Sequence, residues 1–327
     1  MKRYGLLLPH FGPTADRDRL LANAERAEAL GFDSLWVRDH LVYQPHGHED
    51  ADITFVESFT TLAAVAARTE RIHLGFAVLT LFRNPIQTAV LLGSLDFLSG
   101  GGRLEIGWGL GGWREQLRLV GLHDAKRGRL LAEQVEIVRR LLTGERVDYE
   151  GEYASFEGVK ISPVPSQPIP IYIAGSGPMA PARAGRYGDG WFPGRIPVWR
   201  FEQLMQTLRD KSAEHGRPTP PVTIASFVSP ADTVEEGAAH LDLENFTDET
   251  ARRQGLPPSG SYSSIEDLGG AMIAGPPTEI IRHVRAYQAA GVDQFVFDLR
   301  SRFEDFEALL ELLGSEVLPV LRAGDET

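Results

Sequence analysis

The sequence predicts an α/β fold in which eight parallel strands close into a (β/α)8 TIM barrel. Short apolar runs of strand length alternate with longer segments whose apolar residues recur at helical spacing. A crossover helix returns the chain to the same end of a sheet, so this alternation requires parallel strands. No boundary rich in Gly, Ser or charge interrupts the alternation, so we predict a single barrel domain over residues 1–327.

The elements can be assigned in order along the chain. The first helix places Leu20, Ala24 and Ala27 on one face, and Gly31 suits the position after its end. Asn84 followed by Pro85 has the pattern of a helix cap and a first helical residue. The predicted strands are 4–9, 34–39, 72–80, 103–106, 169–174, 190–193, 222–228 and 294–299. The predicted helices are 16–30, 58–68, 85–100, 113–120, 127–142, 199–215 and 277–290, with another through residue 187 and a last one that ends near residue 321. Turn residues and prolines around 145–168 predict a surface insertion in the barrel.

Composition and charge exclude several classes of function. The chain has 33 basic and 45 acidic residues, which argues against nucleic-acid binding because that requires a basic face. It contains no run of about 18 apolar residues, so we expect no membrane span and no membrane partner. It contains no cysteine, which excludes thiolate catalysis and Cys-ligated metal or iron–sulfur sites. We therefore expect a cytoplasmic protein.

Two glycine clusters each follow a predicted strand and precede a predicted helix. Residues 107–112 read G-x-G-x-x-G, the pattern of a dinucleotide-binding fold. Three β/α units precede this cluster, however, and no acidic residue closes a clear next strand, so a barrel mouth or plain turn glycines are the other interpretations. Gly175-Ser176-Gly177 exposes backbone N–H groups at a helix start, which indicates either a phosphate site or a tight turn.

A few polar and aromatic residues are candidates for chemistry. Asp39 and His40 end the second strand, at the face where barrel active sites form, although a loop histidine without a role is the alternative. His10 also lies at this face. The run HGHED at 46–50 lacks the spacing of a ligand set, so we predict no metal site. Four tryptophans near strand ends either line an aromatic pocket or pack in the core: Trp36, Trp108, Trp113 and Trp191.

Six blocks of sequence, taken in order, resemble the bacterial luciferase-like oxidoreductases. They include ERAEALGFDSLWVRDH at 25–40, LDFLSGGGRLEIGWGLGGW at 95–113 and IPIYIAGSGPMAPARAGRYGDGWFP at 169–193. The others lie at 74–85, 127–165 and 275–299, so the resemblance extends over nearly the whole chain. The Trp-x-x-Asp-His end of the second strand and the Gly-rich block that closes on Gly-Trp are most similar to the branch that uses coenzyme F420, a 5-deazaflavin.

The resemblance implies a barrel that binds coenzyme F420, or FMN as the alternative, at its carboxyl mouth. Ala77 and Val78 match a bulge in the third strand, where a non-prolyl cis peptide supports the cofactor ring. Three residues match the phosphate loop: Gly175, Ser176 and Gly177.

Other matched positions lie near the reacting groups. Gly111 and Gly112 match the segment beside the cofactor ring and its side chain. Asp39 and His40 match positions near the reactive face and are the candidate catalytic residues. The chain departs from the family at Phe76 and Trp108, which are larger than usual. It also departs at Gly112, where several deazaflavin enzymes have an acid, so Glu115 is the substitute candidate.

We therefore predict an oxidoreductase that transfers a hydride between coenzyme F420 and a small organic substrate. The nearest alternative is an FMN-dependent monooxygenase that takes an oxygen atom from O2. A non-catalytic deazaflavin-binding barrel and a nicotinamide dehydrogenase are alternatives of other classes. The resemblance also implies a homodimer.

Overall fold

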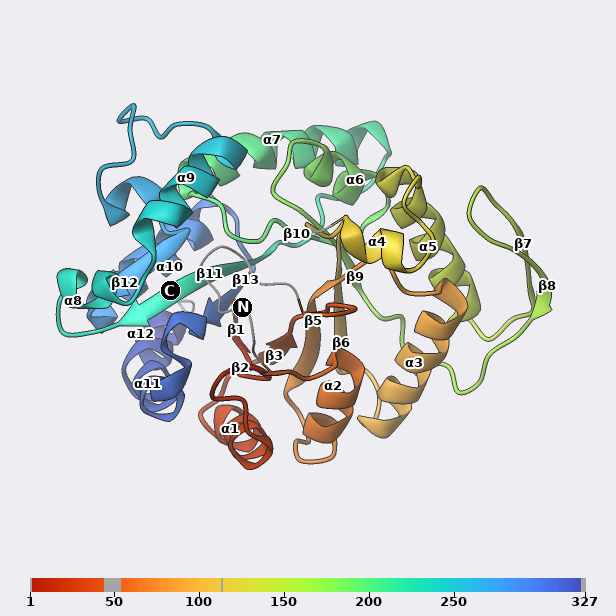
Figure 1. The fold of residues 1–327 in the computed structure, drawn as a ribbon, viewed down its shortest axis with the longest axis horizontal. Coiled ribbons are helices and arrows are strands. Elements are labelled where there is room, and N and C mark those ends of the chain that lie inside the picture. Colours follow the sequence, from red (N-terminus) through yellow and green to blue (C-terminus); the bar gives the residue numbers. More distant parts are fainter. Residues whose placement is uncertain (1, 44–53, 113, 325–327) are drawn as a thin grey trace.

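A curved sheet of parallel strands forms the centre of the computed structural model, which describes residues 2–43, 54–112 and 114–324 (Figure 1). Within these residues the sheet has nine strands, and each pairs in parallel with its neighbours. The strands are β1 (Arg3–Leu7), β3 (Ser34–Val37), β5 (His73–Leu79), β6 (Leu104–Trp108), β9 (Ile171–Ala174), β10 (Gly190–Phe192), β11 (Thr223–Pro230), β12 (Met272–Gly275) and β13 (Gln294–Asp298). The predicted α/β class with parallel strands is confirmed.

The order of the strands follows the order of the chain, except that β12 pairs with β11 at the edge of the sheet and does not lie between β11 and β13. From β1 the pairing proceeds through β3, β5, β6 and β9 to β10, and on the other side of β1 through β13 to β11. Trp191 of β10 forms a parallel bridge with Val222, the residue before β11. A dinucleotide-binding sheet would instead reverse its strand order at a switch point, so this topology argues against the nicotinamide dehydrogenase.

Helices cover the outer face of the sheet (Figure 1). Asn84 caps one of them as predicted, because its side chain accepts hydrogen bonds from the backbone N–H groups of Ile86 and Gln87 at 2.9 and 3.2 Å. No helix in the described part of the chain is long and apolar enough to cross a membrane. The helices are α1 (Arg17–Ala29), α2 (Ser58–Ala66), α3 (Pro85–Leu98), α4 (Glu115–Leu119), α5 (Arg127–Leu141), α6 (Met179–Tyr187), α7 (Val198–Glu214), α8 (Val234–Ala239), α9 (Leu243–Gln254), α10 (Pro277–Ala290), α11 (Phe306–Leu312) and α12 (Leu318–Ala323).

The indole of Trp36 fills the space between neighbouring strands at the centre of the core. Trp36 is fully buried, and its Nε1 donates to Ser34 Oγ at 2.7 Å. A Cβ at Gly75 would lie 2.3 Å from the indole, and one at Gly5 would lie 2.7 Å from Nε1. Glycine is therefore required on both neighbouring strands because the ring occupies the volume that a side chain would need.

The structure also contains elements that the sequence did not predict. Strand β12 was missed because it is only four residues long and follows two glycines, so its apolar run is short. Two antiparallel pairs lie outside the main sheet: β2 (Phe11–Gly12) with β4 (Thr54–Phe55), and β7 (Val147–Glu150) with β8 (Ser155–Val159).

Candidate active site

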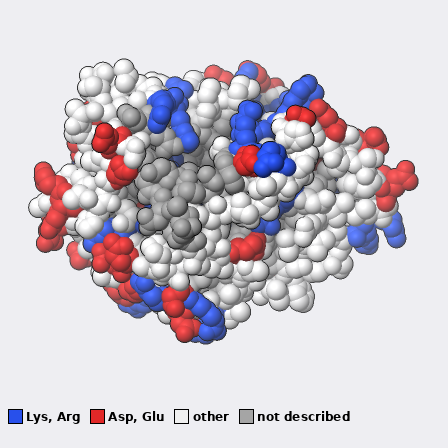
Figure 2. Space-filling view, viewed as in Figure 1, with Lys and Arg blue, Asp and Glu red and all other residues white. Residues whose placement is uncertain are grey.

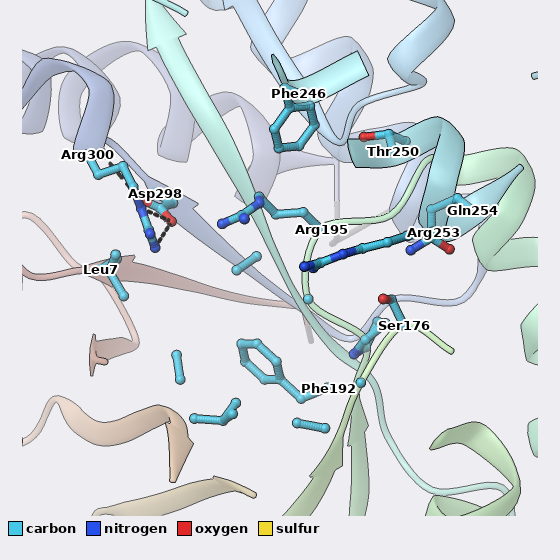
Figure 3. Close-up of a pocket in the computed structure, with 17 residues that line it drawn as sticks. Leu7, Ser176, Phe192, Arg195, Phe246, Thr250, Arg253, Gln254, Asp298 and Arg300 are labelled. Carbon is cyan, nitrogen blue, oxygen red and sulfur yellow. Dashed lines mark hydrogen bonds and ion pairs between the residues drawn. The ribbon is translucent and has the colours of Figure 1, made fainter. Parts of the chain in front are cut away.

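A cavity of about 260 Å³ opens at the carboxyl ends of the parallel strands (Figure 3). Strands β1, β5, β9, β10 and β13 each contribute a residue at or near their carboxyl end, β11 contributes a residue from its first half, and helix α9 forms one wall. This is the position at which parallel α/β folds bind ligands. The strand residues are Leu7, Ala77, Val78, Ala174, Phe192, Ala225 and Asp298.

The floor of this cavity includes an irregularity in β5. The register between β5 and β6 shifts between Phe76 and Leu79, and the Ala77–Val78 peptide is cis. The bulge and the cis peptide that the family resemblance implied are therefore confirmed. A Cβ at Gly107 on β6 would lie 2.6 Å from Phe76 O and 2.7 Å from Val78 Cγ1, so the bulge packs directly on a glycine.

A second cavity, of about 500 Å³, adjoins the first. Val78, Ala174 and Gly175 line both cavities. The walls of the second cavity are the two glycine segments that the sequence singled out, with Gly111 and Gly112 on one side and Gly177 on the other. The seven residues predicted to bind the cofactor thus come together: Ala77 and Ser176 line the first cavity, Gly111, Gly112 and Gly177 the second, and Val78 and Gly175 both.

Three arginines give the second cavity a positive border. Arg183 lines it, and Arg127 donates from Nη1 to Gly111 O at 2.8 Å. Burial and the neighbouring guanidinium groups of Arg114 and Arg183 lower the pKa of Arg127 below its ordinary value. None of the three forms an ion pair with an acidic side chain within the described ranges. Figure 2 shows Lys and Arg side chains on both sides of the hollow in the upper part of this face.

The carboxylate of Asp39 is buried in an ion pair with Arg83. Arg83 Nε donates to Asp39 Oδ2 at 3.1 Å, and Ser58 Oγ donates to Oδ1 at 2.8 Å. The backbone N–H of Thr80, which follows β5, lies 3.3 Å from Oδ2. Asp39 therefore ties the end of β3 to the end of β5, and it does not line either cavity.

His40 lies half-buried beside the end of β3. Its Nε2 is 3.2 Å from Arg38 Nη2, its Nδ1 is 3.3 Å from Gln116 Nε2, and its ring packs edge-on against Phe55. Because a guanidinium can only donate, Nε2 accepts this hydrogen bond. Within the described residues, His40 is near the strand ends but does not line either cavity.

The imidazole of His10 forms hydrogen bonds with two backbone groups and has a structural role. Its Nδ1 donates to Val56 O at 2.9 Å, and its Nε2 accepts from the backbone N–H of Arg38 at 2.9 Å. Burial lowers the pKa of His10 to about 3, against the weaker raising effect of the Val56 hydrogen bond. His10 is therefore a neutral link between the loop after β1 and the end of β3.

The tryptophans belong to the core. Trp36, Trp108 and Trp191 are fully buried and line neither cavity, which favours the core interpretation over an aromatic ligand pocket. Trp113 lies outside the described residues, as do His46 and His48.

Another group of side chains resembles a metal site by proximity alone. Glu266, Glu279 and His283 bring potential ligand atoms within 4.8 Å of one another. Arg282 Nη2, however, lies 3.0 Å from the Glu266 carboxylate and 2.6 Å from that of Glu279. A guanidinium thus already forms ion pairs with both carboxylates.

Helix α9 and three charged residues of the first cavity were missed by the sequence analysis. Phe246, Thr250, Arg253 and Gln254 line the cavity from α9, at the spacing of a single helical face. That spacing was visible in the sequence, but a solvent-facing helix has the same pattern. The three charged residues outside α9 are Arg195, Asp298 and Arg300. Arg300 donates from Nε to Asp298 Oδ1 at 2.9 Å.

Comparison with known proteins now adds to this geometry. The model of the luciferase-like monooxygenase family matches residues 3–294. The chain belongs to this family. It is therefore an oxidoreductase, and the predicted family is confirmed. An F420-dependent glucose-6-phosphate dehydrogenase from Nakamurella multipartita is 32% identical over 96% of this chain and 94% of its own length.

Two solved structures have the same fold. An F420-dependent secondary alcohol dehydrogenase, in complex with an F420-acetone adduct, has a TM-score of 0.82 at 18% identity, over 98% of this chain and 99% of its own. A type II Baeyer-Villiger monooxygenase from Pseudomonas putida, in complex with FMN, has a TM-score of 0.75 at 18% identity, over 97% of this chain and 98% of its own. At such identities the likeness concerns the fold alone.

Proposed function

We propose that this enzyme uses coenzyme F420 to transfer a hydride to or from a small organic substrate. The main observation behind this proposal is that the two cavities adjoin each other. Because Val78, Ala174 and Gly175 line both, a ligand with a flat ring and a long side chain can extend from the strand ends into the second cavity. The F420-dependent relative and the F420-bound neighbour support this choice of cofactor.

The residues of the second cavity fit such a ligand. A Cβ at Gly112 or Gly177 would meet no atom of the described residues beyond its chain neighbours within 4 Å, so these segments leave space there. Arg127 and Arg183 supply positive charge that suits a phosphate. When bound, coenzyme F420 supplies two-electron hydride chemistry, and the protein supplies position, charge and exclusion of water.

Each predicted cofactor residue then has a role that its position supports. Ala77 and Val78 form a floor for the ring at the bulge of β5. Gly111 and Gly112 line the second cavity, where they would lie beside the side chain of the cofactor. The loop of Gly175, Ser176 and Gly177 offers its phosphate site at the start of α6.

Asp39 and His40 have different roles in this proposal. Asp39 positions the end of β5 through Thr80, because its carboxylate is already engaged by Arg83 and Ser58. His40 is the candidate proton donor or orienting group for the substrate. His40→Ala is expected to change both the rate of turnover and its dependence on pH, measured between pH 6 and 8. Unchanged turnover across this range would exclude His40.

A titration of the pure protein with coenzyme F420 and with FMN, followed by fluorescence, tests the cofactor. We expect tighter binding of F420. The second candidate, an FMN-dependent monooxygenase, is favoured by the likeness to the FMN-bound monooxygenase, and a preference for FMN would replace our proposal with it. Tight F420 binding without hydride transfer from any of a panel of alcohols and sugar phosphates would indicate a non-catalytic binding protein.

The proposed architecture is a single (β/α)8 barrel domain with the β7–β8 hairpin as a surface insertion at 145–168. The pairing order and the Trp191–Val222 bridge support the closed barrel. We also propose a homodimer. Helix α3 supports it by exposing apolar side chains: Phe97 is 70% exposed and Leu98 is 62% exposed. The cytoplasmic location stays a prediction.

A further inference from the structure

Gln254 is a buried side chain at the edge of the first cavity, and its carboxamide has no hydrogen-bond partner among the residues that the structure describes. It is the last residue of α9 and is only 7% exposed. Its carboxamide forms no hydrogen bond with any described residue, and Oε1 is buried without a partner. A buried carboxamide without hydrogen bonds costs free energy. A bound ligand that supplies the missing hydrogen bonds would explain why this residue is a glutamine.

Another buried glutamine shows what a structural carboxamide looks like in this protein. Gln134 is 2% exposed, and its Nε2 donates to Leu81 O and to Arg83 O, both at 3.0 Å. These bonds hold the segment after β5 against α5. Gln254 makes no such hydrogen bond to the described part of the chain, so its carboxamide joins no two described elements of the fold.

The position of Gln254 within the cavity indicates which ligand it meets. In Figure 3, Gln254 and Ser176 lie on one side of the cavity, whereas Leu7, Asp298 and Arg300 lie on the other. Ser176 directly follows Gly175 in the chain, and Gly175 lines both the first and the second cavity. The hydroxyl of Ser176 likewise forms no hydrogen bond within the described ranges.

We propose that Gln254, together with Ser176 on the same side of the cavity, binds the ribityl phosphate side chain of the cofactor. Coenzyme F420 and FMN both carry this group, so the inference rests on the proposed use of such a cofactor but not on which of the two is bound. A carboxamide both donates and accepts, which matches ribityl hydroxyls and phosphate oxygens. The opposite side of the cavity, at Asp298 and Arg300, is left for the substrate.

The variant Gln254→Met tests this role because methionine has a similar length and no hydrogen-bonding amide. The dissociation constants for coenzyme F420 and for FMN are measured by fluorescence titration, and the melting temperature is measured without a cofactor. We expect the dissociation constant of the preferred cofactor to rise about tenfold. The melting temperature should stay the same or rise, because no hydrogen bond between described residues is lost. Gln254→Glu should weaken binding further, because it places a carboxylate beside the phosphate.

Gln134→Met is the matched control. It removes the two bonds to Leu81 and Arg83, so its melting temperature should fall while the cofactor affinity of the folded protein changes by no more than about twofold. This control separates the loss of a structural carboxamide from the loss of a ligand contact.

Three results would overturn the inference while the proposed function stands. The first is cofactor affinity in Gln254→Met equal to that of the wild type. The second is a drop in the melting temperature of free Gln254→Met, which would assign a structural role. The third is a raised KM for a substrate at unchanged cofactor affinity, which would assign Gln254 to the substrate. A wild-type protein that binds neither cofactor would overturn the proposed function and the inference together.

Discussion

Replacement of Gly107 by alanine should displace the bulge that forms the floor of the first cavity. Gly107 lies on β6, which pairs with β5, and it packs against Phe76 and Val78 of β5. The added Cβ would lie 2.6 Å from the backbone oxygen of Phe76 and 2.7 Å from Val78 Cγ1. The Phe76 oxygen belongs to the backbone and the Val78 side chain is stiff at χ1, so the backbone of β5 must move.

The size of the effect follows from these distances. Ordinary contacts between heavy atoms are about 3.5 Å or longer, so Gly107→Ala is too close to two groups by nearly 1 Å. Overpacking of this kind costs about 1–3 kcal/mol, and the involvement of a backbone oxygen leads us to expect about 2 kcal/mol. The displaced bulge should also weaken cofactor binding.

Gly112→Ala provides the comparison. Its Cβ would meet no atom of the described residues beyond its chain neighbours within 4 Å, so the free energy of unfolding should stay constant or rise by up to about 1 kcal/mol. Its methyl group would enter the second cavity, and we expect cofactor affinity to fall about fivefold. Urea denaturation measures the first quantity and fluorescence titration the second. Equal stability of Gly107→Ala and Gly112→Ala would refute the reasoning, because it would mean that β5 accommodates the Cβ without strain.

Three other predictions follow from the structure. Arg83→Met should lower the free energy of unfolding by about 3–5 kcal/mol, because it leaves the Asp39 carboxylate buried without its cation. The double variant Arg83→Met/Asp39→Asn should lose less stability than Arg83→Met alone in urea denaturation, because it has no buried carboxylate at position 39. His10 has a pKa of about 3 in the folded chain, whereas the unfolded chain protonates near pH 6.5, so stability should fall as pH decreases. This contribution is about 1.4 kcal/mol per pH unit between pH 6 and 4, and a slope unchanged in His10→Gln would contradict it. Phe97→Glu should convert the proposed dimer to a monomer in light scattering, and an unchanged mass would exclude this face of α3.

The sequence alone predicted the parallel α/β architecture and most of its elements. Local patterns carry this information, because the apolar period and the caps depend on residues only a few positions apart. Asn84 capped its helix as predicted, and the glycine segments lie at strand ends, where a parallel sheet opens to ligands. The bulge at Ala77 and Val78 came from the family resemblance, because no local pattern marks it.

Only the tertiary structure decided which side chains share a cavity. Asp39 and His40 are adjacent in sequence, yet Asp39 is engaged by Arg83, which is 44 positions away. Gln254 belongs to a helix whose polar face resembles a solvent-facing one, and its burial depends on elements far apart in the chain. The physical reason is that hydrophobic periodicity determines which face of an element is buried. The distances between polar groups on different elements depend instead on how those elements pack.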